Sequence, residues 1–282
     1  MLSIARFLRH NPRIAVGLAL LGAMLLFWLI GTLTIGTSKA VPLSGPPDMS
    51  PSVQYPLGTD SAGRQLLPVL IAGMPLTLEV GLLAGGVGLT IGAVLGFSAG
   101  YFGGPIDSVI RTAADVLLPI PALAVLVVIA STIHTVLSVE VMALVVASLA
   151  WMFPTRTIRS QVLSIRNRAY VDVGRFSGEN SLDIIFGELM PNLLPYLAAS
   201  FVGAVGAGIL AAIGLEALGL GPQDAPTLGM TIFWAIYYGA TLRGMWWWWG
   251  PPIVVLILVF IALFTIAQGL DRYANPRLRR TA

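Results

Sequence analysis

Long stretches without a charged residue divide the chain into segments apolar enough to cross a membrane. A transmembrane helix needs about 20 predominantly apolar residues. The shortest candidate window, 141–155, becomes longer at its start if the carboxylate of Glu140 reaches the membrane interface. Six windows are taken as spans: 14–38, 80–106, 116–139, 141–155, 189–215 and 244–270. The pattern predicts an all-α integral membrane protein with six transmembrane helices.

A seventh window, 225–242, is borderline because it contains Pro226, Gly229 and Gly239. The positive-inside rule tests whether it crosses. With six spans and the N-terminus inside, external segments hold only Lys39, Arg64 and Arg243, against thirteen arginines inside. A seventh span would change this distribution to ten inside and six outside. We therefore expect six spans in a cell membrane (inner or plasma), both termini in the cytoplasm, and 225–242 as an external or re-entrant element.

The composition agrees with a chain embedded in a lipid bilayer. Of the 282 residues, 56% are hydrophobic and 10% are charged, whereas a soluble domain carries about 25% charged residues. A soluble enzyme, a disordered regulator and a nucleic-acid binder are excluded on this ground. The pI near 9.5 reflects only sixteen basic against thirteen acidic residues.

Residues for catalysis are scarce. The chain has no cysteine, and its two histidines, His10 and His134, lie far apart in the sequence. Its single lysine, Lys39, falls in an external proline-rich segment, so it cannot serve a nucleotide-hydrolysing P-loop, which needs a lysine directly after its glycines. We expect no metal, no cofactor and no catalytic residue on this chain, which therefore cannot be its own ATPase of the P-loop type.

Two further patterns predict local structure on the external side and within the second span. Prolines between 42 and 56 exclude a long helix in the external segment 37–66. Glycines at 88, 92, 96 and 100 form one face of the second span, where another helix can approach closely. That face serves either packing within this subunit or dimerisation.

The largest cytoplasmic loop, 156–188, is the most charged part of the chain. We expect a helix over 157–176, a break at Gly178 and a second helix over 181–189 leading to Pro191, capped by Ser181 with Asp183 in its first turn. A structured hairpin of this kind favours contact with a cytoplasmic partner. The alternative is a passive basic loop lying against anionic lipid.

A few polar and aromatic residues are candidates for a substrate pathway. Glu79 and Glu216 are expected near the outer ends of the second and fifth spans. They either reach the interface or form a local hydrogen bond, or they line the mouth of a pathway. Trp246–Trp249 precede the sixth span. Indoles favour the membrane interface, and on a helix only one or two of the four, such as Trp246 and Trp247, can face a pathway.

The hairpin carries a resemblance to a known family. Residues 170–178 and 183–192 resemble the EAA loop of ABC importer permeases, in which a glycine follows an acid by six positions and a proline follows that glycine by thirteen. Asp172, Gly178 and Pro191 keep both spacings. The sequence departs from the pattern in carrying Asp for Glu at 172, Val173 and Gly174 for two alanines, and Met190 for leucine.

Four shorter stretches narrow the resemblance to permeases of the dipeptide, oligopeptide and nickel class. They are 55–64, 100–107, 218–221 and 274–277, so the resemblance extends from about residue 55 to 277. The long first external segment is similar to that of the C-type member of the permease pair.

The resemblance implies a type I importer architecture and a set of partners. These are a second permease subunit, two ATPase subunits carrying ATP and Mg²⁺, and an external solute-binding protein. It also implies that the hairpin contains the helix that couples the permease to an ATPase. The coupling residues would be Tyr170, Val171, Asp172, Val173, Gly174, Arg175, Phe176, Ser177, Gly178, Glu179 and Pro191.

We divide the chain into residues 1–74, which hold the first span and the proline-rich external segment, and 75–282, a five-helix permease core with the coupling loop 156–191. The predicted function is the pathway subunit of an ATP-driven importer of short peptides or related oligomers such as oligosaccharides. The alternative is a channel or ion-coupled carrier without ATPase partners, which should show buried acids at the membrane midplane.

Overall fold

The computed structural model of the chain describes residues 8–133 and 135–274, and within these ranges it is helical without a β-strand. Four helical stretches are long and apolar enough to cross a membrane: Pro12–Thr34, Leu66–Phe102, Ser181–Ala217 and Trp246–Arg272. Two bent helix pairs bring the number of candidate spans to six if each pair counts as one. The predicted all-α fold with six spans is confirmed at this level.

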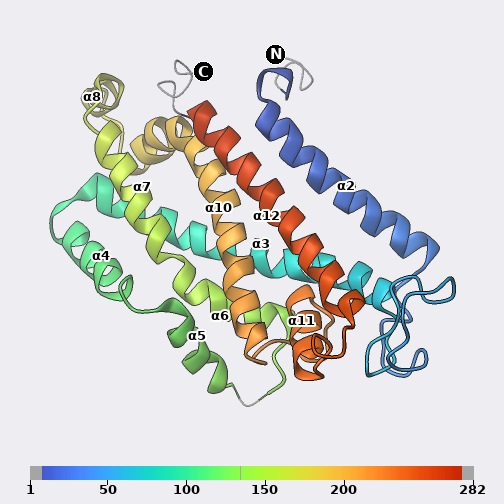
Figure 1. Cartoon of the computed structure of the whole chain (residues 1–282). Coiled ribbons are helices and arrows are strands. Elements are labelled where there is room, and N and C mark those ends of the chain that lie inside the picture. The colour runs from blue at the N-terminus through green and yellow to red at the C-terminus, as the bar shows by residue number, and fades with distance from the viewer. Residues whose placement is uncertain (1–7, 134, 275–282) are drawn as a thin grey trace.

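The helices run in the order shown in Figure 1. Their bounds are α2 Pro12–Thr34, α3 Leu66–Phe102, α4 Gly104–Leu117, α5 Ala122–Ser131, α6 Val139–Ala150, α7 Met152–Ile165, α8 Ala169–Phe176, α9 Ser181–Asp183, the π-helical turn η1 Ile184–Leu189, α10 Met190–Ala217, α11 Leu228–Tyr237 and α12 Trp246–Ala274. His134 and most of the stretch 274–277 lie outside the described residues.

Both bent pairs break next to prolines. α4 and α5 meet at 86°, with Pro119 and Pro121 between them, so the third span is not the continuous helix expected over 116–139. α6 and α7 meet at 44°, and Pro154 lies in the first turn of α7, where it cannot donate a backbone hydrogen bond to the preceding turn. The fourth span is consequently longer than expected and continues through Ile165.

The second span begins earlier than its charge-free window. α3 starts at Leu66 rather than at 80 and continues through Glu79 for 37 residues. The division expected between residues 74 and 75 therefore falls inside this helix. α3 crosses the molecule diagonally, and α6, α7 and α10 pack against it (Figure 1).

The glycine face of α3 is occupied within this chain. A methyl group at Gly92 would lie 2.9 Å from the Trp151 carbonyl oxygen, and one at Gly96 would lie 2.9 Å from the Thr155 carbonyl oxygen. Gly100 meets α7 in the same way. The glycines therefore allow α7 to pack closely against α3 within the subunit, which is the first of the two alternatives expected for this face.

The window 225–242 does not cross the molecule. It contains only α11, which has ten residues and is about 15 Å long at 1.5 Å per residue, half of a hydrocarbon core. Its neighbour Arg243 contacts Asp48 and Ser61 from the segment between α2 and α3. These contacts place both loops at the same end of the molecule, as the six-span prediction requires.

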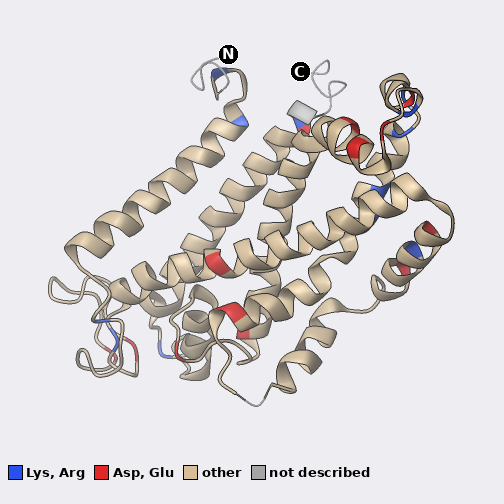
Figure 2. Cartoon of the chain, turned by 180° about the vertical axis from the view of Figure 1, so that it is seen from behind, with Lys and Arg blue, Asp and Glu red and all other residues tan. Residues whose placement is uncertain are grey.

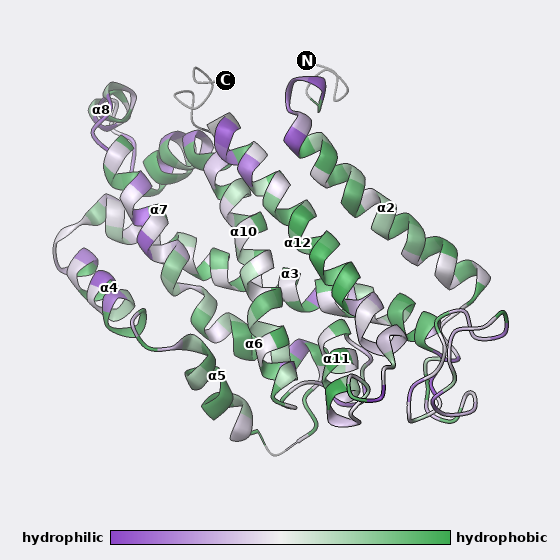
Figure 3. Cartoon of the chain, viewed as in Figure 1, coloured by the Kyte–Doolittle hydropathy of each residue, from purple (hydrophilic) through white to green (hydrophobic). Residues whose placement is uncertain are grey.

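Polar residues gather at the two ends of the molecule. α8 and the start of α2 lie at one end, called here the α8 end, and the segment 35–65 lies at the opposite, outer end (Figure 1). Charged residues concentrate near these ends and on α4, whereas the other helices between the ends are mainly hydrophobic (Figures 2 and 3). The described chain thus has the apolar middle that a bilayer requires.

The segment 35–65 has no helix, as its prolines predicted, but it is held by side-chain hydrogen bonds. Asp60 is fully buried and accepts hydrogen bonds from the backbone of Ala62 and Arg64 and from Arg64 Nε at 2.6 Å. Thr59, also buried, donates to the Pro46 carbonyl at 2.6 Å. The stretch 55–64, which carried part of the family resemblance, therefore stabilises the conformation of this segment.

Candidate functional site

The hairpin between α7 and α10 presents an apolar tip at the α8 end of the molecule. Val173 and Phe176 are 63% and 90% exposed, and Leu182 and Phe186 are 62% and 59% exposed. The first two are spaced by three positions on α8 and the second two by four positions on the α9–η1 stretch, so each pair shares one face of its helix. We call these four residues the hairpin knob.

The root of the hairpin is buried in the chain. Val171 is fully buried and packs in a cluster with Phe97 of α3, Ile158 and Val162 of α7, and Leu193 of α10. Ile184, Ile185 and Leu189 from the second arm belong to the same cluster. One apolar cluster thus joins both arms of the hairpin to α3, α7 and α10.

Charged side chains fix the orientation of α8. Asp172 lies in its first turn and Arg175 in its last turn, where each interacts favourably with the helix dipole. Arg175 pairs with Asp172 at 3.2 Å and lies 5.7 Å from the ring centroid of Tyr101 in α3. Burial raises the pKa of the neighbouring Tyr170 above its ordinary value.

The turn of the hairpin is where the sequence placed it. Gly178 has a φ of +83°, a left-handed conformation that disfavours side chains bearing a Cβ. The first arm differs from expectation, because residues 166–168 separate α7 from α8 and no single helix covers 157–176. The cap also differs: the Asn180 side chain, not that of Ser181, accepts from the backbone of Leu182 and Asp183.

The second arm continues into the fifth span. Ser181–Ala217 forms one helical stretch in which Ile184–Leu189 adopts a wider π-helical turn. Pro191 lies two residues after this turn and has no N–H to donate to it, which accounts for irregular bonding there. The expected boundary between a separate hairpin helix and a span beginning near Leu189 is therefore wrong, and Pro191 lies at the junction.

Glu79 lies deeper in the molecule than expected. It is thirteen residues after the first residue of α3 rather than near a helix end. It lines a groove of about 510 Å³ between α2, α3, α10 and α12 whose other walls are apolar and include Trp28 and Leu263. Glu79 has no hydrogen bond or ion pair with another described residue.

Glu216 is buried inside the chain. It is 1% exposed and accepts a hydrogen bond from the Thr227 hydroxyl, which belongs to the turn before α11. A methyl group at Gly229 would collide with its carboxylate. Of the alternatives for this residue, the local hydrogen bond is found, and the buried carboxylate does not reach the surface of the chain.

The four tryptophans form the first turn of α12 and point in different directions. Trp246 is 57% exposed, whereas Trp248 is fully buried and stacks on Tyr238 at 6.0 Å between ring centroids. Trp247 packs against Gly58 of the outer segment. Trp247 and Trp249 are half-buried, so Trp246 is the most exposed of the four and the best placed for contacts outside the chain.

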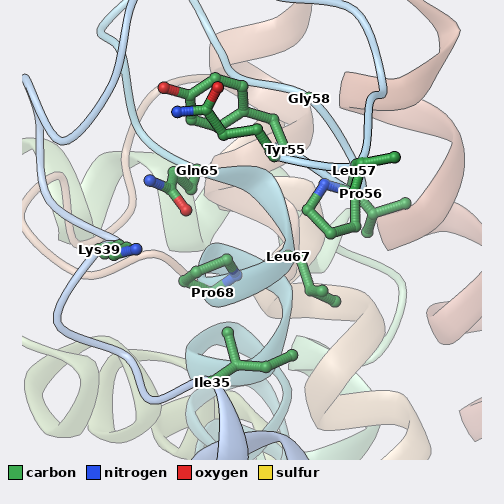
Figure 4. Close-up of a pocket in the computed structure, with 11 residues that line it drawn as sticks. Ile35, Lys39, Tyr55, Pro56, Leu57, Gly58, Gln65, Leu67 and Pro68 are labelled. Atoms are coloured by element: carbon green, nitrogen blue, oxygen red, sulfur yellow. The ribbon is translucent and has the colours of Figure 1, made fainter.

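Two further exposed aromatic residues lie at the C-terminal end of α11. Tyr237 and Tyr238 are 67% and 45% exposed, and their rings contact each other and Trp234. This outer aromatic patch, defined as Tyr237 and Tyr238, lies at the end of the molecule opposite to the hairpin (Figure 1). A separate pocket of about 190 Å³ lies nearby between the outer segment and the start of α3, where Lys39, Tyr55 and Gln65 line it (Figure 4).

Comparison with known proteins supports this architecture. Residues 88–280 match the family described as the binding-protein-dependent transport system inner membrane component. The chain belongs to this family. The resemblance to ABC importer permeases, derived from the hairpin, is thereby confirmed.

Relatives in this permease family include proteins named for peptide transport. The chain is 30% identical over 275 residues to the dipeptide transport system permease protein DppC of Bacillus subtilis, covering 98% of this chain and 85% of that protein. It is 30% identical over 173 residues to the oligopeptide transport system permease protein OppC of Mycobacterium tuberculosis. That second alignment spans 61% of this chain and 60% of the relative, less than two thirds of its length.

Several residues of the permease were not singled out from the sequence. Leu182 and Phe186 extend the knob beyond the run 170–179, and their i,i+4 spacing on an expected helix was the available signal. Thr227 gave no signal, because its contact with Glu216 arises only after the chain turns between α10 and α11.

Proposed function

We propose that this permease is the pathway subunit of an ATP-driven importer for short peptides, and that the hairpin knob docks onto an ATPase subunit. Family membership supports a role in binding-protein-dependent transport. The observation that carries the docking proposal is the exposed apolar knob on a buried root. An exposed apolar patch rimmed by charged residues is typical of a protein interaction site.

The proposed assembly contains a second permease subunit, two ATPase subunits and an external binding protein. ATP and Mg²⁺ would bind the ATPase chains. In this assembly the α8 end faces the cytoplasm and the outer segment faces the other side of the membrane. The excess of arginine at the α8 end favours this orientation through the positive-inside rule.

Coupling would proceed through the hairpin root. Closure of the ATPases on nucleotide moves the knob, and the cluster around Val171 passes this displacement to α3, α7 and α10. Two arrangements of these helices would open the pathway to one side or the other, and ATP binding biases the equilibrium between them. The tight turn at Gly178 keeps the knob compact during this movement.

Peptides are the proposed substrate class because the relatives described above are peptide permeases by name. The outer aromatic patch favours the same class, since aromatic faces stack on apolar or aromatic side chains. Neither relative is named for oligosaccharide transport, so the oligosaccharide alternative has no support from them.

An ion-coupled carrier remains a second candidate because of one observation. Glu79 lies in the interior of α3 and lines an apolar groove, whereas the sequence placed it at a helix end. An acid within a membrane segment is a functional candidate by default. Uptake that requires Glu79 and an ion gradient, but no ATPase subunit, would favour this alternative.

The docking proposal is tested by copurification with the ATPase subunits. Phe176→Ala removes the most exposed knob side chain, and we expect recovery of ATPase to fall at least about tenfold, corresponding to 1.4 kcal/mol of binding free energy. Phe153→Ala is the matched control, because Phe153 is 67% exposed on α7 outside the knob. Equal recovery with both variants would contradict docking at the knob.

A further inference from the structure

A crevice between α4 and α7 is lined largely by arginine. Its walls are formed by Arg111, Ala114 and Asp115 of α4 and by Thr155, Arg156 and Arg159 of α7. The crevice has a volume of about 190 Å³, enough for several water molecules at about 30 Å³ each. A tetrahedral phosphoryl group therefore fits without separating the helices.

The charges around this crevice are unbalanced. Arg159 is held by Asp107, whose two carboxylate oxygens accept from Nε and from Nη2, the latter at 2.6 Å. Arg111 and Arg156 make no hydrogen bond or ion pair with any described residue. Asp115 is the one carboxylate lining the crevice, so one positive charge remains in excess.

The outer side of α4 is apolar and uncovered in this chain. Ile106, Val109 and Val116 are 47%, 70% and 62% exposed, and their spacing puts them on one face of the helix. Asp107, Arg111 and Asp115 follow each other at i,i+4 intervals on the opposite face, toward α7. The side of α4 toward the crevice is thus polar, and the side away from α7 is suited to contact with hydrocarbon chains.

We propose that the α4–α7 crevice binds the phosphodiester headgroup of an anionic phospholipid, with Arg111 and Arg156 as its ligands. Guanidinium groups pair with phosphate oxygens through two parallel hydrogen bonds, and basic pockets between membrane helices bind anionic headgroups. The bound lipid supplies the negative charge that the chain itself lacks at this point.

The experiment compares lipid binding by the full chain and by an Arg111→Gln/Arg156→Gln variant. The proteins are exchanged into mixed micelles of phosphatidylglycerol and phosphatidylcholine, and retained lipid is counted by native mass spectrometry. We expect the preference for phosphatidylglycerol to fall at least about tenfold, since the variant loses both guanidinium groups that would pair with the phosphate. Arg9→Gln/Arg272→Gln removes the same charge at the α8 end and is the matched control.

A second arm separates a lipid headgroup from free phosphate. Inorganic phosphate at increasing concentration is titrated against the retained phosphatidylglycerol of the unmodified chain. Retention at millimolar phosphate supports the lipid as occupant, whereas displacement together with direct phosphate binding would overturn it in favour of a soluble anion. Equal loss of phosphatidylglycerol in the crevice variant and the control would also overturn the proposal.

A conservative variant guards against misfolding. Arg111→Lys/Arg156→Lys keeps both charges but not the planar fork, and it should retain a larger share of the phosphatidylglycerol preference than the glutamine variant. A lysine variant that loses as much lipid as the glutamine variant while its helical circular dichroism is unchanged would contradict an electrostatic headgroup site.

Discussion

Gly178 is the residue at which sequence and geometry agree most closely. Its spacing from Asp172 suggested a turn, and the backbone at Gly178 has a φ of +83°. No atom lies within 4 Å of the position that a methyl group on its Cα would occupy. A side chain at this position would therefore meet conformational strain and not steric overlap. The residue can be tested without disturbing the packing around it.

We expect Gly178→Ala to destabilise the hairpin turn by about 1–2 kcal/mol, the cost of placing an L-residue in the left-handed region. Peptide uptake and stimulation of the ATPase should fall, while the amount of folded permease stays constant. Gly187→Ala is the control, since Gly187 also has open space around it but no positive φ. Uptake by both variants at the unmodified rate would contradict a role for this turn.

The environment of Glu216 is formed by residues of the turn before α11 and of α11 itself, which follow it in the sequence. Its carboxylate accepts from Thr227 and packs against Gly229, so it ties the end of α10 to the start of α11. When one partner of a buried hydrogen bond is removed, the other is left without a partner, and this lowers the stability of the folded protein.

Glu216→Ala should destabilise the permease by about 2–4 kcal/mol through a cavity and an unpaired Thr227 hydroxyl. The measurement is thermal or denaturant unfolding in micelles. Glu79→Ala, which removes a partly exposed carboxylate, should cost at most about 0.5 kcal/mol. Similar losses for the two variants would show that burial of Glu216 contributes little.

Among the elements, α3 organises the fold because its glycines admit α7 at short distance. Gly92 faces the backbone of Trp151 and Thr155, which cannot move aside as a flexible side chain does. Gly86 on the same helix has its nearest neighbouring atom, from Phe201, at 3.8 Å from the position of an added methyl group. Gly86 and Gly92 are therefore a matched pair: both are glycines of α3, but only Gly92 is in close contact with another helix.

Gly92→Ala should therefore destabilise the permease by about 1–3 kcal/mol, the usual cost of overpacking. Gly86→Ala should be neutral or slightly stabilising, because alanine is the better helix former. Unfolding of both variants in micelles provides the comparison. A neutral effect of alanine at Gly92 would mean that α3 and α7 separate readily.

At the scale of the whole molecule, an ion pair joins the outer segment 35–65 to the loop between α11 and α12. Arg243 Nη2 donates to Asp48 Oδ2 at 2.5 Å, and Arg243 also donates to Ser61. The hydrogen bond from Arg243 holds the pKa of Asp48 below its ordinary value, and Ser61 adds to this effect. Stability from this contact must therefore depend on pH.

Because the pKa of Asp48 is lower in the folded protein, its contribution is complete above about pH 4, the unfolded value, and is lost as pH falls further. Asp48→Asn should reduce stability at pH 7 by at most about 1 kcal/mol, as for other surface pairs. The difference in unfolding free energy from the unmodified permease, measured in micelles, should shrink as the pH is lowered below about 4. A difference that stays constant down to the lowest pH at which the permease folds would contradict this assignment.

The number of spans could be predicted from the sequence, but their bounds could not. The window beginning at 80 missed the first turns of α3 because Glu79 interrupts its hydrophobic run. The bend between α4 and α5 follows from Pro119 and Pro121, whose effect depends on how the flanking helices pack. The hairpin turn was predictable because a glycine with φ above zero is a local property.

The sequence by itself determined the membrane-spanning character of this protein, the grouping of its charged loops and the position of the hairpin turn. These properties depend on transfer free energies and backbone preferences of neighbouring residues. The tertiary structure decided that the glycine face of α3 meets α7, that Glu216 is buried against Thr227 and that Trp248 is enclosed while Trp246 is exposed. Those outcomes depend on residues brought together from distant parts of the chain.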